Sequence, residues 1–100
     1  MLMGFRIEFS ERARDNLKIL RKRDQQIVVD AIDVQLAHEP DRRTRNRKRL
    51  EENTIAPWEL RVGPFRVFYD IDVENELVII VAVGEKTHNT LQIGGEEIDL

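Results

Sequence analysis

Apolar residues follow two different periods in the stretch that leads up to Lys22. Residues 5–9 alternate between apolar and polar, which predicts a short strand, and Ser10 after them suits the N-cap of a helix. From there to about Lys22 the apolar residues recur every three or four positions, the spacing of an amphipathic helix. These patterns predict a strand followed directly by a helix.

A second helix is predicted between Asp24, which can cap its first turn, and the sequence His38-Glu39-Pro40, where proline ends it. His38 is then placed to interact with the carbonyl groups at the helix end. The connection to the first helix is so short that the two should form an antiparallel hairpin. The stripe expected to face the core consists of Ile27, Val28, Ala31, Ile32, Gln35 and Leu36.

Strand patterns occupy the second half of the chain. Residues 58–62 and 65–72 alternate with period two, and Gly63-Pro64 between them predicts a tight hairpin. A second turn at 73–76 leads to residues 77–83. This last stretch is apolar on both faces, so it belongs in the interior of a sheet.

The order strand, helix, helix, strand, strand, strand predicts an α+β domain in which the helical hairpin covers one face of a small, mostly antiparallel sheet. A chain of 100 residues with 41% hydrophobic and 35% charged residues is expected to form one domain over residues 1–100. Trp58 is expected to anchor its core. Gly94-Gly95 predicts a turn, and the acidic residues 96–100 are expected to be solvated or to lie against the basic residues.

Strand alternation also predicts a candidate site. If the apolar residues of the two strands that flank Gly63 face the helices, Arg61 and Arg66 project together from the uncovered face. Lys86 and His88 follow just beyond the next strand. Because guanidinium groups match the oxygens of phosphate, this arrangement predicts a cationic concavity that binds phosphate. Asp70 is an alternative partner for Arg66 on the same face.

The net charge of -3 hides a strong asymmetry between the halves of the chain. Residues 1–50 contain 13 basic and 8 acidic residues, whereas residues 51–100 contain 3 basic and 11 acidic ones. Six of the basic residues fall within eight positions, a density that repels itself unless an anion lies nearby. This run is equally compatible with RNA or ribosome binding and with a solvated loop. Its members are Arg42, Arg43, Arg45, Arg47, Lys48 and Arg49.

Cysteine is absent from the sequence, so neither a disulfide framework nor a thiolate metal site is expected, and a reducing cytoplasm is the natural location. No stretch reaches membrane-spanning length, and the first residues lack the apolar run of a secretory signal. The acidic residues at 70–76 lack the glycine and the distal glutamate of a calcium loop. We therefore expect a cytoplasmic protein that uses no metal and no cofactor and contacts no membrane.

The stretches 58–72 and 81–95 resemble the RelE/ParE superfamily of bacterial toxins. The likeness covers nearly the whole chain and includes the helical hairpin, the basic connection and the sequence Arg-Val-Phe-Tyr-Asp at 66–70. It implies the toxin component of a type II toxin–antitoxin system, with a cognate antitoxin whose flexible segment folds onto the toxin. RelE-type members cleave mRNA in the ribosomal A site without a metal, by promoting attack of a ribose 2′-hydroxyl on the adjacent phosphate.

The resemblance also implies roles for individual residues, with the ribosome and mRNA as further partners. Arg66 matches the arginine that holds the scissile phosphate, and Arg61 matches a cationic position on the paired strand. Lys86 matches the basic residue that follows the Val-Gly pair. His88 is a candidate general acid or base, because imidazole exchanges protons near neutral pH.

Two positions depart from the RelE pattern. Glu59 stands where RelE has a second lysine, and Gln92 stands where it has a C-terminal tyrosine that stacks on the nucleotide. The alternatives are a ParE-like protein that inhibits DNA gyrase by binding alone, and a relative that is not toxic. The sequence favours a ribosome-dependent mRNA endoribonuclease, because gyrase binding leaves Arg66 and His88 without a chemical task.

Overall fold

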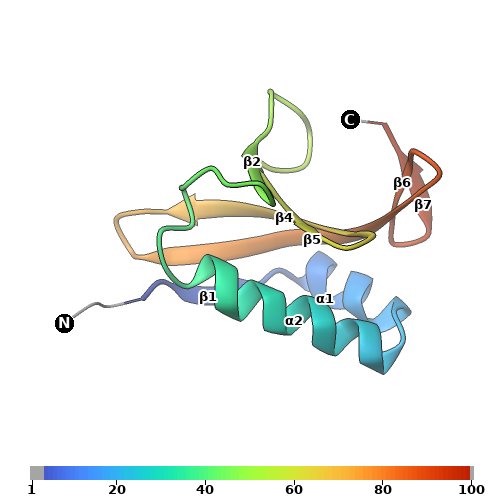
Figure 1. Ribbon diagram of the computed structural model, residues 1–100, viewed down its shortest axis with the longest axis horizontal. Helices are drawn as coiled ribbons and strands as arrows, with labels where there is room; N and C mark the ends of the chain where they lie inside the picture. Colours follow the sequence, from blue (N-terminus) through green and yellow to red (C-terminus); the bar gives the residue numbers. More distant parts are fainter. Residues whose placement is uncertain (1–3, 100) are drawn as a thin grey trace.

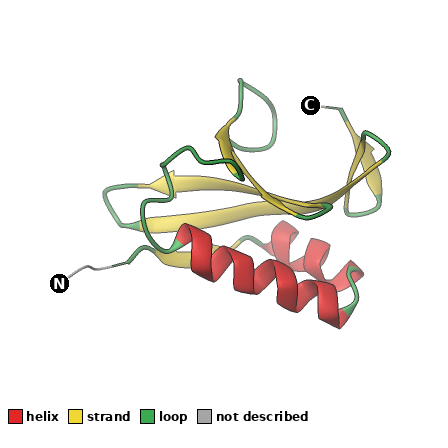
Figure 2. Ribbon diagram, viewed as in Figure 1, coloured by secondary structure: helices red, strands yellow, loops and turns green. Residues whose placement is uncertain are grey.

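The computed structural model describes residues 4–99 of the chain. Two helices lie against one face of a twisted sheet of seven strands, as Figures 1 and 2 show. No helix within residues 4–99 is long and apolar enough to span a membrane. In chain order the elements are β1 (Arg6–Phe9), α1 (Glu11–Ile19), α2 (Lys22–Leu36), β2 (Arg47–Arg49), β3 (Trp58–Val62), β4 (Phe65–Asp72), β5 (Leu77–Thr87), β6 (Thr90–Ile93) and β7 (Glu96–Ile98).

The sheet has the order β2-β3-β4-β5-β6-β7 with antiparallel neighbours, and β1 pairs in parallel with β5. The predicted α+β class and the helical cover of one face are confirmed. Three strands were not predicted: β2 lies within the basic run, and β6 and β7 form a hairpin. Of the acidic residues 96–100, Glu96–Ile98 form a paired strand in which Glu96 and Glu97 are exposed, so they are solvated as predicted but not irregular. These strands are short and polar, so distant pairing partners rather than a local pattern decide their structure.

The helix boundaries differ in part from the prediction. Ser10 caps α1 as predicted, because its Oγ accepts a hydrogen bond from the amide of Ala13 at 3.0 Å. However, α1 ends earlier than predicted, and α2 begins at Lys22, so Asp24 does not cap it. Asp24 instead lies in the first turn, with its carboxylate 3.8 Å from Arg21 at the N-cap position. An acidic residue there is favourable because it faces the positive end of the helix dipole.

β5 is the longest strand, and two strands share one of its edges. Its first residues pair with β1, whereas Gly84–Thr87 pair with β6. Side chains from the N-cap and the body of α1 close the edge between them. Ser10 Oγ donates to the carbonyl of Val81 at 2.8 Å, and Asn16 Oδ1 accepts from the next free amide, that of Val83, at 3.0 Å. Because Asn16 is buried, no water replaces this bond if it is lost.

An extra residue in β5 changes which side chains face the helices. The register with β4 shifts between Phe68 and Tyr69, which leaves Val81 without a partner in β4. Side chains of β5 that face the helices lie at even positions before this bulge and at odd positions after it. Lys86 is thereby turned to the face away from the helices. Without the extra residue it would point into the helix-covered core.

Two hydrophobic cores lie on opposite faces of the sheet. The larger core, between the helices and the sheet, contains Trp58 stacked on Tyr69 with ring centroids 6.0 Å apart. The role of Trp58 as a core anchor is thus confirmed. The smaller core corrects the prediction of an uncovered face, because loop 50–57 and the β6–β7 hairpin rise from that face and cover part of it (Figure 1). Its buried members are Ala56, Phe68, Ala82, Leu91 and Ile93.

Replacement of the side chain that closes the β5 edge should destabilise the protein. We expect Asn16→Ala to lower the free energy of unfolding by about 1–3 kcal/mol, because the buried amide of Val83 loses its acceptor. Urea denaturation measures the difference. Arg14→Ala, an exposed change on the same helix, should alter the stability by less than about 0.5 kcal/mol. Equal stability of the Asn16 variant and the wild type would contradict this role.

Candidate functional site

The loop and the hairpin that rise from the sheet leave a recess on the face away from the helices. It has two adjoining compartments, which share Glu59, Arg66 and Lys86. The loop compartment, of about 310 Å³, is otherwise lined by Lys48, Leu50, Glu51, Glu52, Asn53 and Arg61. The hairpin compartment, of about 190 Å³, is otherwise lined by Asn89, Leu91, Ile98 and Asp99.

The recess gathers the basic residues of the acidic half of the chain. Residues 51–100 contain three of them, Arg61, Arg66 and Lys86, and all three line the recess. Arg61 pairs with Arg66 across β3 and β4, as the alternation predicted. Lys86 lies two positions beyond Gly84, the residue of β5 that pairs with Arg66. Cations that converge from three strands of an otherwise acidic region indicate a site for an anion.

Arg66 is held in place by the protein itself. It is 8% exposed, and its Nη1 donates to the carbonyl oxygens of Gly63 and Phe65 at 2.8 and 2.9 Å. Its Nε lies 4.0 Å from Glu59 Oε1. The partners of Arg66 are therefore Glu59 and two backbone carbonyls rather than Asp70. Because these contacts fix the guanidinium, little side-chain entropy remains to be lost when a ligand binds.

Burial and neighbouring charges both act on Arg66, and the recess around it contains acidic as well as basic side chains. Burial lowers the pKa of the Arg66 guanidinium from its ordinary value, Arg61 lowers it further, and the Glu59 carboxylate acts in the opposite direction. Arginine nevertheless keeps its proton in proteins. Lys48 Nζ from β2 also lies 3.8 Å from Glu59 Oε1, so one carboxylate sits between two cations. An anion bound in the recess would relieve the remaining repulsion.

The basic run divides between structural and exposed positions. Arg47 has a structural role, because its Nη1 donates to the carbonyl oxygens of Gln35 and Glu39, both at 2.9 Å, at the end of α2. The sequence had favoured His38 for this position at the helix end, and the arginine from β2 occupies it instead. The predicted RNA contact of Arg47 would require it to leave these bonds.

The other members of the run lie around the edge of the sheet. Arg49 lies over the ring of Trp58, with 5.9 Å between the guanidinium carbon and the ring centroid. Arg42 pairs with Glu39 on the surface at 3.4 Å. Lys48 lines the loop compartment. The two remaining arginines, Arg43 and Arg45, are exposed on the segment before β2.

Lys86 and His88 lie on different structural elements. β5 extends to Thr87, so Lys86 belongs to the strand and does not follow it as predicted. His88 and Asn89 form the turn to β6, with φ angles of 50° and 66°. Asn89 lines the hairpin compartment, whereas His88 is exposed and is absent from the lining of both compartments within residues 4–99.

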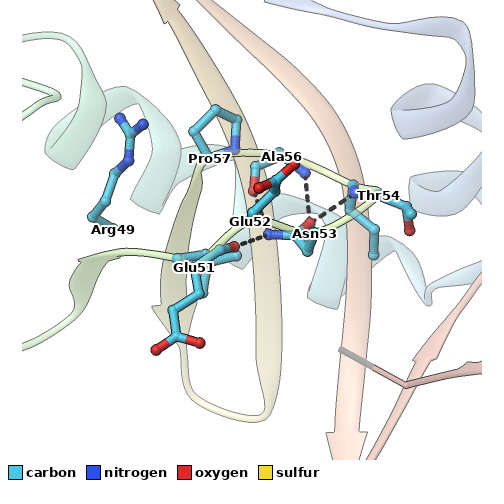
Figure 3. Close-up of a pocket in the computed structure, with 9 residues that line it drawn as sticks. Arg49, Glu51, Glu52, Asn53, Thr54, Ala56 and Pro57 are labelled. Atoms are coloured by element: carbon cyan, nitrogen blue, oxygen red, sulfur yellow. Dashed lines mark hydrogen bonds between the residues drawn. The ribbon is translucent and has the colours of Figure 1, made fainter.

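Hydrogen bonds of one side chain fix the shape of loop 50–57, which lines both the loop compartment and the neighbouring hollow drawn in Figure 3. Asn53 Oδ1 accepts from the amides of Ile55 and Ala56 at 2.7 and 3.1 Å. Its Nδ2 donates to the carbonyls of Glu51 and Ala56 at 2.8 and 3.0 Å. Glu51 and Glu52 therefore reach the recess from a loop with a fixed shape.

Sequence reasoning missed the central position of Glu59, which it treated only as a departure from a family pattern. A signal was available, because Glu59 precedes Arg61 by two positions and so shares its face of the strand. Asn89 and Asp99 carried no local signal. They reach the recess only because the β6–β7 hairpin folds over the sheet.

Comparison with known proteins places this architecture in a family. A family model described as the ParE toxin of the type II toxin–antitoxin system, parDE, matches residues 7–89. The chain therefore belongs to the ParE toxin family, within the RelE/ParE superfamily of type II toxins. No match was found among curated proteins.

Two solved toxin–antitoxin complexes contain chains with a similar fold. One is RelBE2 from Mycobacterium tuberculosis, with 28% sequence identity and a TM-score of 0.74 over 86% of this chain and 95% of that chain. The other is the archaeal RelE–RelB complex from Pyrococcus horikoshii, with 22% identity and a TM-score of 0.65 over 81% and 93%. At the latter identity the similarity concerns the fold alone.

Removal of the carboxylate between the cations should make the protein dependent on added anions. We expect Glu59→Gln to lower the free energy of unfolding by about 1 kcal/mol at low salt, because Arg66 keeps its positive neighbours and loses its negative one. Inorganic phosphate should restore the stability more than chloride of equal ionic strength. Urea denaturation in each salt measures this, with the exposed Glu85→Gln as the control. If phosphate had the same effect on both variants, the recess would not be an anion site.

Proposed function

We propose that this toxin inhibits translation as a ribosome-dependent, metal-independent mRNA endoribonuclease. The observation that supports the proposal most strongly is the convergence of Arg61, Arg66 and Lys86 on one recess beside a carboxylate. A toxin that acts only by binding another protein requires a complementary surface. It has no need for a buried guanidinium that is fixed inside a concave site.

The proposed reaction needs a base, cations and an acid. The 2′-hydroxyl oxygen forms a bond to the adjacent phosphorus while the bond from phosphorus to the 5′-oxygen breaks, which yields a 2′,3′-cyclic phosphate and a 5′-hydroxyl end. In this scheme Glu59 accepts the proton of the 2′-hydroxyl. Arg66, with Arg61 beside it, stabilises the charge on the pentacoordinate phosphorus. Lys86, or His88 from the adjoining turn, returns a proton to the leaving 5′-oxygen.

The exposed arginines of the basic run are proposed to bind RNA outside the recess. Arg42, Arg43, Arg45 and Arg49 are exposed, and phosphate contacts to them would add affinity that falls as the salt concentration rises. Lys48, inside the loop compartment, would contact the RNA closer to the scissile phosphate.

A binding-only inhibitor of DNA gyrase is the second candidate. The matching family model is that of ParE toxins, and His88 lies outside the lining of the recess. In this case the cations would contact an acidic surface of the target rather than a reacting phosphate.

A cognate antitoxin is the partner that we propose for this chain in the cytoplasm. Both similar structures were solved as toxin–antitoxin complexes. An antitoxin segment that carries a carboxylate could occupy the recess and pair with Arg66, which would block access of RNA.

Replacement of Arg66 should abolish the toxic activity. We expect Arg66→Ala to eliminate growth inhibition and to reduce cutting at the A-site codon at least about a hundredfold, because a fixed cation at a developing charge contributes that much. Arg66→Lys should retain only part of the activity, since an ammonium lacks the planar fork. The measurement is to incubate each protein with ribosomes stalled on a defined message and to map the 5′ ends of the mRNA.

The controls separate the role of Arg66 in folding from its role in the reaction. Arg66 is buried, so the unfolding transition of each variant is measured first. The double variant Arg61→Ala, Lys86→Ala changes only exposed residues and should also abolish cutting. Arg12→Ala, an exposed change on α1, should cut like the wild type. A folded wild-type protein that leaves the message intact and inhibits supercoiling by gyrase would refute the proposed reaction.

A further inference from the structure

We propose that the hairpin compartment binds a guanine base of the RNA and that Asp99 selects this base. The proposal rests on the proposed function, since it places the phosphate next to that base on Arg66 and Lys86. It adds a substrate preference and assigns a task to the β6–β7 hairpin, a part of the chain that the proposed reaction leaves unused.

The two compartments meet at the cations. Glu59, Arg66 and Lys86 line both of them, so a phosphate held by Arg66 and Lys86 lies at their junction. A nucleotide chain continues on both sides of each phosphate. One neighbouring nucleoside is therefore directed into the loop compartment and the other into the hairpin compartment.

The walls of the two compartments differ in their chemistry. The loop compartment is lined mainly by charged side chains. Besides the three charged residues that both compartments share, the hairpin compartment contains two apolar side chains, Leu91 and Ile98, which face each other across β6 and β7. Asn89 and Asp99 complete its lining. A pair of apolar side chains beside polar groups suits a flat base, whose faces are apolar and whose edge carries hydrogen-bonding groups.

The walls of the hairpin compartment are packed tightly enough to discriminate between bases. Leu91 is 8% exposed and belongs to the smaller core with Phe68 and Ala82. Gly84 permits this close packing, because a Cβ at that position would lie 2.5 Å from the carbonyl oxygen of Gln92. The hairpin is therefore packed tightly against β5, and the compartment has a defined width.

The carboxylate of Asp99 indicates which base fits best. A carboxylate accepts hydrogen bonds through two oxygens and donates none when ionised. Guanine presents two adjacent donors on one edge, N1–H and the N2 amino group, and can therefore satisfy both oxygens. The other three bases present an acceptor next to each donor on that edge. A site that is built to accept from two donors rejects a base that lacks one of them.

Titration with the four nucleoside 5′-monophosphates tests this assignment without ribosomes. The methyl resonances of Leu91 and Ile98 report on the hairpin compartment, and the Nε–H resonance of Arg66 reports on the phosphate. We expect guanosine monophosphate to shift all three and to bind about tenfold more tightly than the other nucleotides. Asp99→Asn should remove this preference, so that the four nucleotides bind with similar affinity. Glu97→Gln, two positions before Asp99 and outside the lining of the compartment, is the matched control and should behave like the wild type.

The outcomes separate this proposal from the proposed function. Equal binding of the four nucleotides, or shifts confined to the loop compartment, would overturn the guanine assignment whether or not the protein cuts mRNA. Guanine selectivity without cutting would overturn the endoribonuclease reaction alone. If the wild type cuts mRNA, the mapped ends should show guanine beside the cut, and Asp99→Asn should reduce this bias about tenfold.

Discussion

The bulge at Val81 is the constraint on which the site depends. It turns Lys86 toward the face that carries Arg66, and it lies where β5 passes from one edge partner to the next. A bulge leaves backbone groups unpaired, and these groups need other partners when they are buried. On the other edge of β5, Ser10 at the N-cap of α1 bonds the carbonyl of Val81, and Asn16 further along the helix bonds the amide of Val83. Helix α1 thus holds β5 at the bulge and just beyond it.

The site itself combines electrostatic strain with rigidity. Arg66 is buried near other cations, with a single carboxylate and two carbonyls to hold it. Such an arrangement costs stability unless an anion completes it. In the proposed function, Arg66 is thus held in place before a phosphate binds, which would lower the entropy lost on association. Glu59 is central in two senses, since it balances the charge of Arg66 and, in the proposed reaction, accepts the proton.

The central fold could be predicted from the sequence because its strands and helices have strong local periods. The pairing of Arg61 with Arg66 followed from the same alternation. The strands β2, β6 and β7 could not be predicted, because their polar sequences are ordered by pairing with distant segments. The second core could not be predicted either, because part of it comes from β6. The position of Glu59 was missed because a family pattern was given more weight than the alternation of its own strand.

The most direct test of the phosphate site is a crystal structure of the protein with an RNA tetranucleotide whose 2′-hydroxyls are methylated, so that it cannot be cut. The phosphate that joins the two central nucleosides should lie in the recess, with oxygens at about 2.7–3.0 Å from the nitrogens of Arg66 and Lys86. RNA bound only along the exposed Arg43 and Arg45, with the Arg66 guanidinium still engaged solely by Glu59 and the carbonyls of Gly63 and Phe65, would contradict the assignment of the recess.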